Sequence, residues 1–403
     1  MSTAARSADS SFATHEQPVR AIPIAGLTFF CSLGTGVLWN AIYFIAQSSY
    51  GFTQTDSLLL AFVNGLLYTV VAMSAGRTVR FLERRMNPRA ALGMVLLTQA
   101  IMAPLVLIFP HVVTLWICAV LMTSLGALQW PIVQHYLVSG RHGGEMRNAI
   151  GWWNVSWMAA SAMGLAAAGP LQTFDLMKWA IPALLPVNLI ALCFLLRFPA
   201  HPMKHDADAH AHHVPRSYHS LLACARVLHP IAYLVIGALA PILPYLFSSL
   251  GTDASLQAPI GATWHVTRLL AVIVLWRTAF WHGRGASLMV AGVLLSLGFA
   301  LAVAAPNETL LIIGLTALGI GQGTIYYSAI YYGLAIGAAE VDAGGIHEAL
   351  VGAGYFVGPL LGLLALSAGA GTPVFIGLVL GAVSVGFVVS IARGRAVARQ
   401  PSS

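Results

Sequence analysis

Long apolar stretches separated by short polar segments run through the whole chain. Twelve stretches are long enough for a helix that crosses a bilayer core about 30 Å thick, which takes roughly 20 residues. They cover approximately residues 23–47, 57–80, 90–109, 112–138, 149–170, 178–197, 228–249, 259–280, 286–305, 309–336, 345–367 and 372–392. Strands of a membrane barrel would instead alternate apolar and polar residues over about ten positions. The pattern therefore predicts an all-α integral membrane protein with 12 transmembrane helices.

The longest polar interruption, residues 198–227, lies between spans six and seven. It predicts a linker between an N-terminal six-helix bundle, residues 23–197, and a C-terminal one, residues 228–392. Tails are expected at 1–22 and 393–403. Pro131, Pro241 and Pro244, in spans four and seven, remove backbone donors and permit kinks.

Three short segments recur in the same order in the two halves. The pairs are 76–80 with 276–280, 125–129 with 318–322, and 169–171 with 358–360. Internal repeats of this kind are typical of transporters built from two related halves. We therefore expect the two bundles to be pseudo-symmetric.

Composition agrees with a membrane protein and excludes several other classes. Only 8% of the 403 residues are charged and 58% are apolar, whereas a soluble domain carries about 25% charged residues. Four cysteines within or beside apolar runs do not suggest a disulfide framework. The sequence has no P-loop, HExxH or CxxC motif. We expect no enzyme activity, no cofactor and no resident metal.

The basic residues predict the orientation of the helices. With a cytoplasmic N-terminus, 18 of the 20 Lys and Arg residues fall in cytoplasmic segments, and only Lys178 falls in an external loop. The remaining one, Arg268, lies within span eight. Cytoplasmic loops carry such an excess of basic residues. We expect a multi-pass protein of the plasma (inner) membrane with both termini in the cytoplasm.

With 12 spans in two halves, a cytoplasmic middle loop and basic loops 2–3 and 8–9, the chain resembles the major facilitator superfamily (MFS) over its whole length. In loop 2–3, Gly76 and the basic pair 84–85 match the superfamily motif. Arg80 stands where that motif has Asp, and Glu83 where it has a second Gly. The resemblance rests on architecture more than on this motif.

The resemblance implies a secondary transporter. Two six-helix bundles would rock about a central cavity and move a small organic solute by alternating access, with or without H+ as a second cargo. The lipid bilayer and the solute are then the partners, with no nucleic acid and no obligate protein partner. The alternative is a transporter-like protein that acts as a sensor or partner subunit without transport.

Polar and aromatic side chains within the spans are the candidate solute-binding residues. Polar groups at membrane depth are costly and mostly face a bundle interior or a wet cavity. The candidates are Asn40, Gln129, Asn154, Trp157, His265, Arg268, Gln322 and Tyr326. For any single Asn or Gln, ordinary hydrogen bonding between helices is the alternative interpretation.

Arg268 is the most informative of these residues. It lies near the centre of span eight, where an Arg costs about 2.5–3.5 kcal/mol to insert. His265 lies one turn earlier on the same face. Arg268 is expected to bind an anionic or carbonyl-bearing solute or to pair with an acid during transport. A fixed structural ion pair is the alternative.

Glu348 is the only acid inside a predicted span. A lone carboxylate at membrane depth is a candidate proton carrier. Alternatively, the acids Glu348, Glu340 and Asp342 form a cytoplasmic gate with Arg77 or Arg80 of loop 2–3. The two interpretations are equally compatible with the sequence.

The predicted linker contains six histidines between residues 201 and 219. Imidazoles so close together can hold Zn or Ni loosely. The alternating alanines favour a flexible, solvated tether instead.

Overall fold

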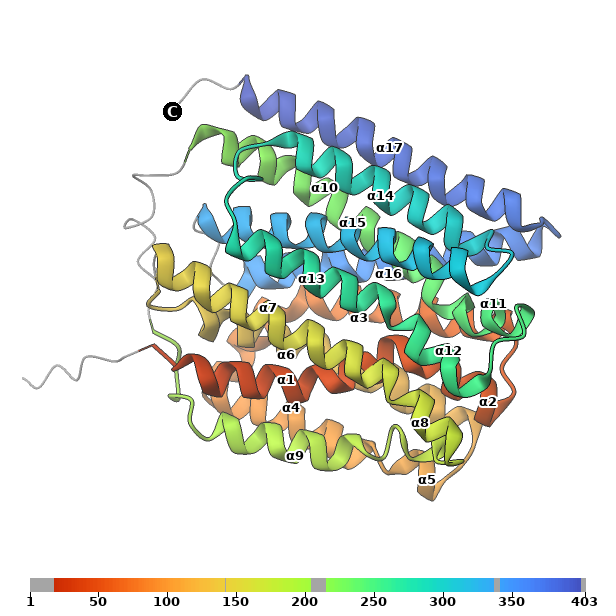
Figure 1. Ribbon diagram of the computed structural model, residues 1–403. Helices are drawn as coiled ribbons and strands as arrows, with labels where there is room; N and C mark the ends of the chain where they lie inside the picture. Colours follow the sequence, from red (N-terminus) through yellow and green to blue (C-terminus); the bar gives the residue numbers. More distant parts are fainter. Residues whose placement is uncertain (1–17, 142, 204–214, 337–340, 400–403) are drawn as a thin grey trace, which may run out of the picture.

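A computed structural model of the chain describes residues 18–141, 143–203, 215–336 and 341–399 (Figure 1). These residues form helices and connecting turns, and they contain no strand. Eleven of the helical segments are long and apolar enough to cross a membrane. α7 (Gly143–Ala166) with α8 (Ala168–Thr173) runs between the same two ends and completes the predicted 12 crossings. The expected all-α membrane fold is confirmed.

The N-terminal half occupies the lower part of Figure 1. Besides α7 and α8, its elements are α1 (Ala21–Gly36), η1 (Val37–Ala41), α2 (Ile42–Tyr50), α3 (Gln54–Glu83), α4 (Pro88–Met102), α5 (Leu105–Ile108), α6 (Val112–Val138), η2 (Met177–Trp179) and α9 (Leu184–Leu195).

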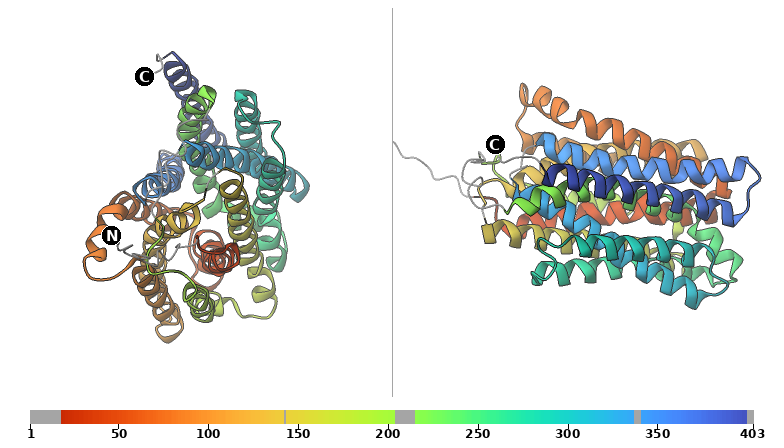
Figure 2. Two further views of the ribbon diagram at one scale, coloured as in Figure 1. Left: turned by 90° about the vertical axis from the view of Figure 1, so that its left-hand side faces the viewer. Right: turned by 90° about the horizontal axis from the view of Figure 1, so that it is seen from above.

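The C-terminal half occupies the upper part of Figure 1. Its elements are α10 (Arg216–Leu239), η4 (Ala240–Ile242), α11 (Leu243–Ser249), α12 (Ala254–Gly261), α13 (Thr263–Arg277), α14 (Gly285–Val303), α15 (Glu308–Ala335), α16 (Val341–Ser367) and α17 (Thr372–Ala398). The helices of both halves run roughly parallel to one axis, and α1 begins at the same end at which α17 ends (Figure 1 and Figure 2). We call this the terminal end of the molecule.

Local sequence explains the tight turn between the first two spans. Gly51 ends α2 with a positive φ of 67°, a conformation that glycine adopts without strain. Thr53 then caps α3, because its hydroxyl accepts a hydrogen bond from the Asp56 amide while the Asp56 carboxylate accepts one from the Thr53 amide. This reciprocal capping satisfies donors that would otherwise be unpaired at the helix start.

The two halves meet along two pairs of helices. α3 packs along α16, where the Cα of Gly65 lies so close to the backbone of Tyr355 and Phe356 that a Cβ would come within 2.5 Å of it. α7 packs on α13, where Gly151 faces the indole of Trp276. α3 and α13 are spans two and eight, and α7 and α16 are spans five and eleven. The two interfaces are therefore equivalent under the internal repeat.

The end away from the termini is closed by direct contacts between the halves. Gln47 Nε2 on α2 donates to Ser248 Oγ on α11 at 3.4 Å. The Tyr245 hydroxyl, also on α11, lies 2.9 Å from Ser57 Oγ and donates to the Phe52 carbonyl at 2.8 Å. These contacts join the first and second spans of one half to the first span of the other.

The terminal end is hollow between the halves. A vestibule of about 840 Å³ lies there, with α6 on one side and α15 on the other. Its lining includes Leu137 and Val138 from α6, and Ala329, Ile330 and Gly333 from α15. The halves thus meet in direct hydrogen bonds at one end and have a vestibule between them at the other.

Candidate functional site

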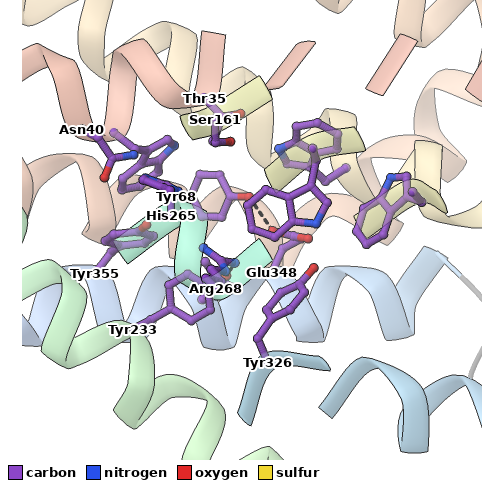
Figure 3. A pocket seen from close by; sticks show the side chains of 15 residues that line it. Thr35, Asn40, Tyr68, Ser161, Tyr233, His265, Arg268, Tyr326, Glu348 and Tyr355 are labelled. Atoms are coloured by element: carbon purple, nitrogen blue, oxygen red, sulfur yellow. Dashed lines mark hydrogen bonds between the residues drawn. The ribbon is translucent and has the colours of Figure 1, made fainter. Parts of the chain in front are cut away.

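A cavity of about 590 Å³ lies between the two halves (Figure 3). α1, η1, α3, α6 and α7 line it from one half, and α10, α13, α15 and α16 line it from the other. Eight of its 15 lining residues are tryptophan or tyrosine, and its two charged residues are Arg268 and Glu348. The cavity is therefore largely aromatic, with one group of each sign.

Arg268 enters this cavity from α13 and is only 1% exposed. Its guanidinium carbon lies 4.1 Å from the ring centroid of Trp157 and 4.9 Å from that of Tyr326. Nη2 donates to the Tyr233 hydroxyl at 3.0 Å. Desolvated cation–π contacts of this kind are worth about 2 kcal/mol. Aromatic faces from both halves thus hold the cation.

Arg268 has no ion-pair partner among the described residues. Its Nε is buried without a hydrogen-bond acceptor. A guanidinium has five N–H donors and no acceptor, so a bound group that carries oxygen acceptors would satisfy the donors that remain. The fixed structural ion pair that the sequence left open does not occur within the described residues.

Glu348 faces the same cavity from α16 and is 7% exposed. Its Oε2 accepts a hydrogen bond from the Tyr68 hydroxyl at 2.6 Å, and its Oε1 accepts one from Gln134 Nε2 at 2.7 Å. Tyr68 is on α3 and Gln134 is on α6, so both donors come from the opposite half. Figure 3 shows the contact between Tyr68 and Glu348.

The structure brings six of the residues singled out in the sequence around this cavity. They are Asn40, Trp157, His265, Arg268, Tyr326 and Glu348. Asn40 lies in the π-helical turn η1, and its Oδ1 has no hydrogen-bond partner. Both ring nitrogens of His265 are also buried without partners. Such groups are available to a ligand.

Three predicted binding residues do not line the cavity. Asn154 lies behind it, where its Oδ1 accepts a hydrogen bond from Trp157 Nε1 at 3.0 Å. Gln129 lines a separate, smaller space within the N-terminal half, beside Gln99 and Asn188. Gln322 on α15 is fully buried, and neither of its amide atoms has a partner.

The residues of the proposed gate lie apart from Glu348. Arg77 and Arg80 are exposed near the terminal end of α3. The hydrogen bonds of Glu348 go to Tyr68 and Gln134 rather than to either arginine. Glu340 and the side chain of Asp342 lie outside the part of the chain that the structure describes.

Sequence reasoning missed several tyrosines that shape the cavity. Tyr68, Tyr233 and Tyr355 line it, and Tyr355 stacks on Trp39 with ring centroids 4.3 Å apart. Within an apolar span, the sequence does not distinguish a tyrosine that lines a cavity from one that packs in the core. One signal was present for Tyr355, which lies seven residues after Glu348 and so shares its helix face.

Two histidines lie near the boundary between the cavity and the vestibule. His229 on α10 and His347 on α16 stack with ring centroids 4.4 Å apart. Both line the vestibule, and Tyr326 lies 5.6 Å from His229 and 5.8 Å from His347, measured between ring centroids. Trp153 lines both spaces. The cavity and the vestibule are thus neighbours at the terminal end.

Within the described residues, no group of three or more His, Cys, Asp or Glu side chains is arranged to hold a metal ion. Residues 204–214 of the histidine-rich segment lie outside the described residues. The expectation of a solvated tether there stays a prediction.

Comparison with known proteins identifies the fold. No protein-family model and no curated protein sequence matches the chain. The structure of the human organic anion transporter MFSD10 (TETRAN) matches with a TM-score of 0.65 and 13% identity, over 93% of this chain and 100% of that one. The nucleoside transporter NupG matches with a TM-score of 0.63 and 13% identity, over 94% and 99%. The chain therefore has the fold of MFS transporters.

Proposed function

We propose that the chain is a secondary transporter that moves a small organic solute across a membrane by alternating access. The observation that carries this proposal is the cavity between the two halves. It is closed by direct contacts at one end and adjoins a vestibule at the other. A solute site at the interface of two related bundles is the arrangement that alternating access requires.

The solute site comprises Asn40, Trp157, His265, Arg268 and Tyr326, with Gln129, Asn154 and Gln322 as supporting residues. Cation–π contacts fix the guanidinium of Arg268, while unpartnered polar atoms remain on Asn40 and His265. MFSD10 and NupG are described as organic anion and nucleoside transporters. The solutes named for these two transporters support a small organic cargo.

We place the protein in the plasma (inner) membrane with both termini in the cytoplasm. The distribution of Lys and Arg supports this orientation, because basic residues gather in the segments at the terminal end. In this orientation the vestibule lies on the cytoplasmic side of the cavity.

Proton coupling is assigned to Glu348. Its carboxylate lies in the cavity and receives hydrogen bonds from neutral donors only. It can therefore gain and lose a proton without breaking an ion pair. The gate formed by Arg77, Arg80 and Asp342 is the competing role, and it predicts that Arg80→Asp impairs transport.

Flux into proteoliposomes tests the transporter function. The solute is first sought by thermal shift, since a ligand raises the melting temperature of the state that it binds. A radiolabelled hit should then enter proteoliposomes that contain the protein, and a proton gradient should accelerate its entry. A hit that binds tightly but never crosses would contradict transport and favour a sensor.

A further inference from the structure

We infer that the solute is an organic monoanion whose acidic group binds Arg268, and that it crosses together with one proton carried by Glu348. This inference rests on the proposed transporter function and names the substrate class and the stoichiometry of its site. The argument starts from the charges in the cavity.

The first step is the state of Arg268. The side chain is 1% exposed, its Nη2 donates to a neutral phenol, and its Nε has no acceptor. A buried charge is stabilised only when it is paired and hydrogen-bonded. Cation–π contacts with Trp157 and Tyr326 offset part of the desolvation cost. A carboxylate supplies what is missing, because it matches the planar guanidinium and adds the opposite charge.

The second step excludes Glu348 as the permanent partner of Arg268. The two Glu348 oxygens already accept hydrogen bonds from Tyr68 and Gln134. No ion pair joins Glu348 to Arg268 in the described residues, although both line the same cavity. The cation therefore stays available to an incoming anion.

The third step is competition between negative charges. With Glu348 ionised, the cavity holds one positive and one negative group. A bound monoanion then gives an excess negative charge in a low-dielectric space, which is unfavourable. Protonation of a Glu348 oxygen removes that excess. The bound proton therefore strengthens the binding of the anion, and the bound anion strengthens the binding of the proton by the same factor, because linkage is reciprocal.

Among the described residues, the lining of the cavity and of the vestibule contains no acid besides Glu348. The titratable and charged groups that face this region are Tyr68 from α3, Arg226, His229 and Tyr233 from α10, His265 and Arg268 from α13, Tyr326 from α15, and His347 and Tyr355 from α16. Arg268 is the permanent positive charge within the cavity, and Arg226 is an exposed one that lines the vestibule. One proton and one monoanion then cross without net charge, and the proton leaves Glu348 on the side where the solute is released.

The walls of the cavity indicate the body of the anion. Trp39 and Tyr355 form a stacked pair, and Tyr68 meets Trp39 edge to face at 5.2 Å between ring centroids. Aromatic walls favour a flat, apolar body. A small aromatic carboxylate has both features, so benzoate is a suitable probe.

The substrate class is tested with three probes of similar shape and different charge. Benzoate, benzamide and benzylammonium are titrated against the full-length protein in nanodiscs, and the melting temperature is recorded. Benzoate should stabilise the protein, and the other two should not. Equal stabilisation by benzamide, or no response to benzoate, would overturn the assignment of an anion.

Variants connect the binding of benzoate to Arg268. Arg268→Gln should weaken benzoate binding by at least about tenfold, because truncating one member of a buried charge pair is costly. Arg395→Gln, at an exposed position near the terminal end of α17, is the matched control and should bind benzoate as the natural protein does. Unchanged affinity in Arg268→Gln would contradict the site.

The proton is tested separately. In weakly buffered solution, benzoate binding should be accompanied by the uptake of a proton, and the affinity should fall as the pH rises through the range in which Glu348 ionises. Glu348→Gln mimics the protonated carboxyl, so it should bind benzoate without proton uptake and without this pH dependence. An unchanged pH dependence in Glu348→Gln would overturn the role of Glu348.

A measurement on the natural protein covers the case in which Glu348→Gln does not fold. Benzoate-driven transport should produce no net current in an electrophysiological recording of proteoliposomes, and a sustained current would contradict the stoichiometry. Flux of a neutral solute such as uridine without any preference for anions would refute this inference but leave the transporter function standing. Benzoate binding that depends on Arg268 without flux would refute transport instead.

Discussion

Asn154 acts on the cavity through its neighbour. Its Oδ1 accepts a hydrogen bond from Trp157 Nε1 at 3.0 Å, and its Nδ2 donates to the Ile150 carbonyl at 2.8 Å. The hydrogen bond to Ile150 fixes the orientation of the Asn154 amide, and the amide oxygen in turn fixes the indole of Trp157. The indole in turn lies 4.1 Å from the guanidinium carbon of Arg268. Asn154 is therefore a positioning residue.

A double-mutant cycle tests this role. Asn154→Leu should weaken benzoate binding, because the Trp157 ring loses its anchor. Trp157→Phe keeps an aromatic face but has no N–H, so adding Asn154→Leu to it should cost little more. We expect a coupling energy of roughly 1 kcal/mol, within the range for residues in contact.

Calorimetry on the four proteins gives the affinities. Additive effects would mean that Asn154 acts only on general stability and does not position Trp157.

At the residue scale, the charged residues of the cavity were easier to predict from the sequence than the aromatic residues that line it. Arg268 and Glu348 could be identified because ionisable groups in a span are costly and so have a reason to be there. For Gln129 and Gln322, the sequence could not show whether the side chain faces the cavity or another helix. An amide is tolerated in many interhelical positions, and the face that it occupies depends on how the helices are rotated.

Among the helices, α3 and α16 form the closest interface between the halves. Gly65 makes this approach possible, because its missing side chain leaves room for the backbone of Tyr355 and Phe356. Small residues at such crossings let helix backbones pack tightly in a membrane.

Gly65→Ala should therefore lower the melting temperature and impair transport. The new Cβ would lie 2.5 Å from backbone atoms that have no rotamer to change. Gly381→Ala on α17 is the control, since a Cβ there meets nothing within 4 Å. In helix propensity alone, Ala is better than Gly by about 1 kcal/mol. If the two variants have the same melting temperature, close packing at Gly65 does not contribute to the stability of the protein.

The loop between α13 and α14 carries a pH-sensitive group. His282 stacks on Tyr331 of α15 with ring centroids 4.8 Å apart. Burial, and then the positive charge of Arg147, lower the pKa of His282 from its ordinary value of 6.5. The unfolded chain takes up this proton near pH 6.5, whereas the folded protein resists it. The stability due to the neutral ring is thus present above pH 6.5 and is lost as the pH falls below it.

His282→Phe retains a ring for Tyr331 but cannot be protonated. We expect the melting temperature of the natural protein to fall relative to this variant between about pH 7 and 5. The difference should be constant above that interval. Parallel melting curves across the whole interval would show that His282 does not contribute to acid sensitivity.

The ends and breaks of helices were only partly predictable. Pro241 and Pro244 indicated a kink in span seven, where the structure has the short turn η4 between α10 and α11. Pro131, by contrast, lies inside the continuous helix α6. The π-helical turn η1, which carries Asn40, has no proline or glycine within it. It depends on packing between helices rather than on a local sequence signal.

At the scale of the whole molecule, the bilayer made the fold predictable. Lipid requires every spanning segment to satisfy its own backbone, so apolar stretches of sufficient length become helices. Of the 12 predicted spans, span five is the one whose helix, although α7 is 24 residues long, is not apolar enough to be identified as a membrane helix from its composition. The conformational state was not predictable, because one sequence must adopt both open and closed arrangements at each end, and these differ by only a few kcal/mol.

The contacts at the end away from the termini should therefore be breakable, and locking them should stop transport. Gln47 and Ser248 face each other there at 3.4 Å between Nε2 and Oγ. A Gln47→Cys, Ser248→Cys pair should be joined by a short bifunctional methanethiosulfonate reagent, which forms a disulfide with each cysteine and spans the gap left by the shorter side chains. Cys193→Ser removes the one exposed native cysteine among the four, so that it cannot compete.

Cross-linking should abolish solute flux in proteoliposomes, and a reductant, which cleaves both disulfides to the reagent, should restore it. Each single-cysteine variant should transport equally well with and without the reagent. A locked protein should still bind a ligand that reaches the cavity from the vestibule, because only the closed end has been fixed. Transport that continues at full rate in the cross-linked protein would mean that the α2–α11 contact does not open, and the exit path would then have to lie elsewhere.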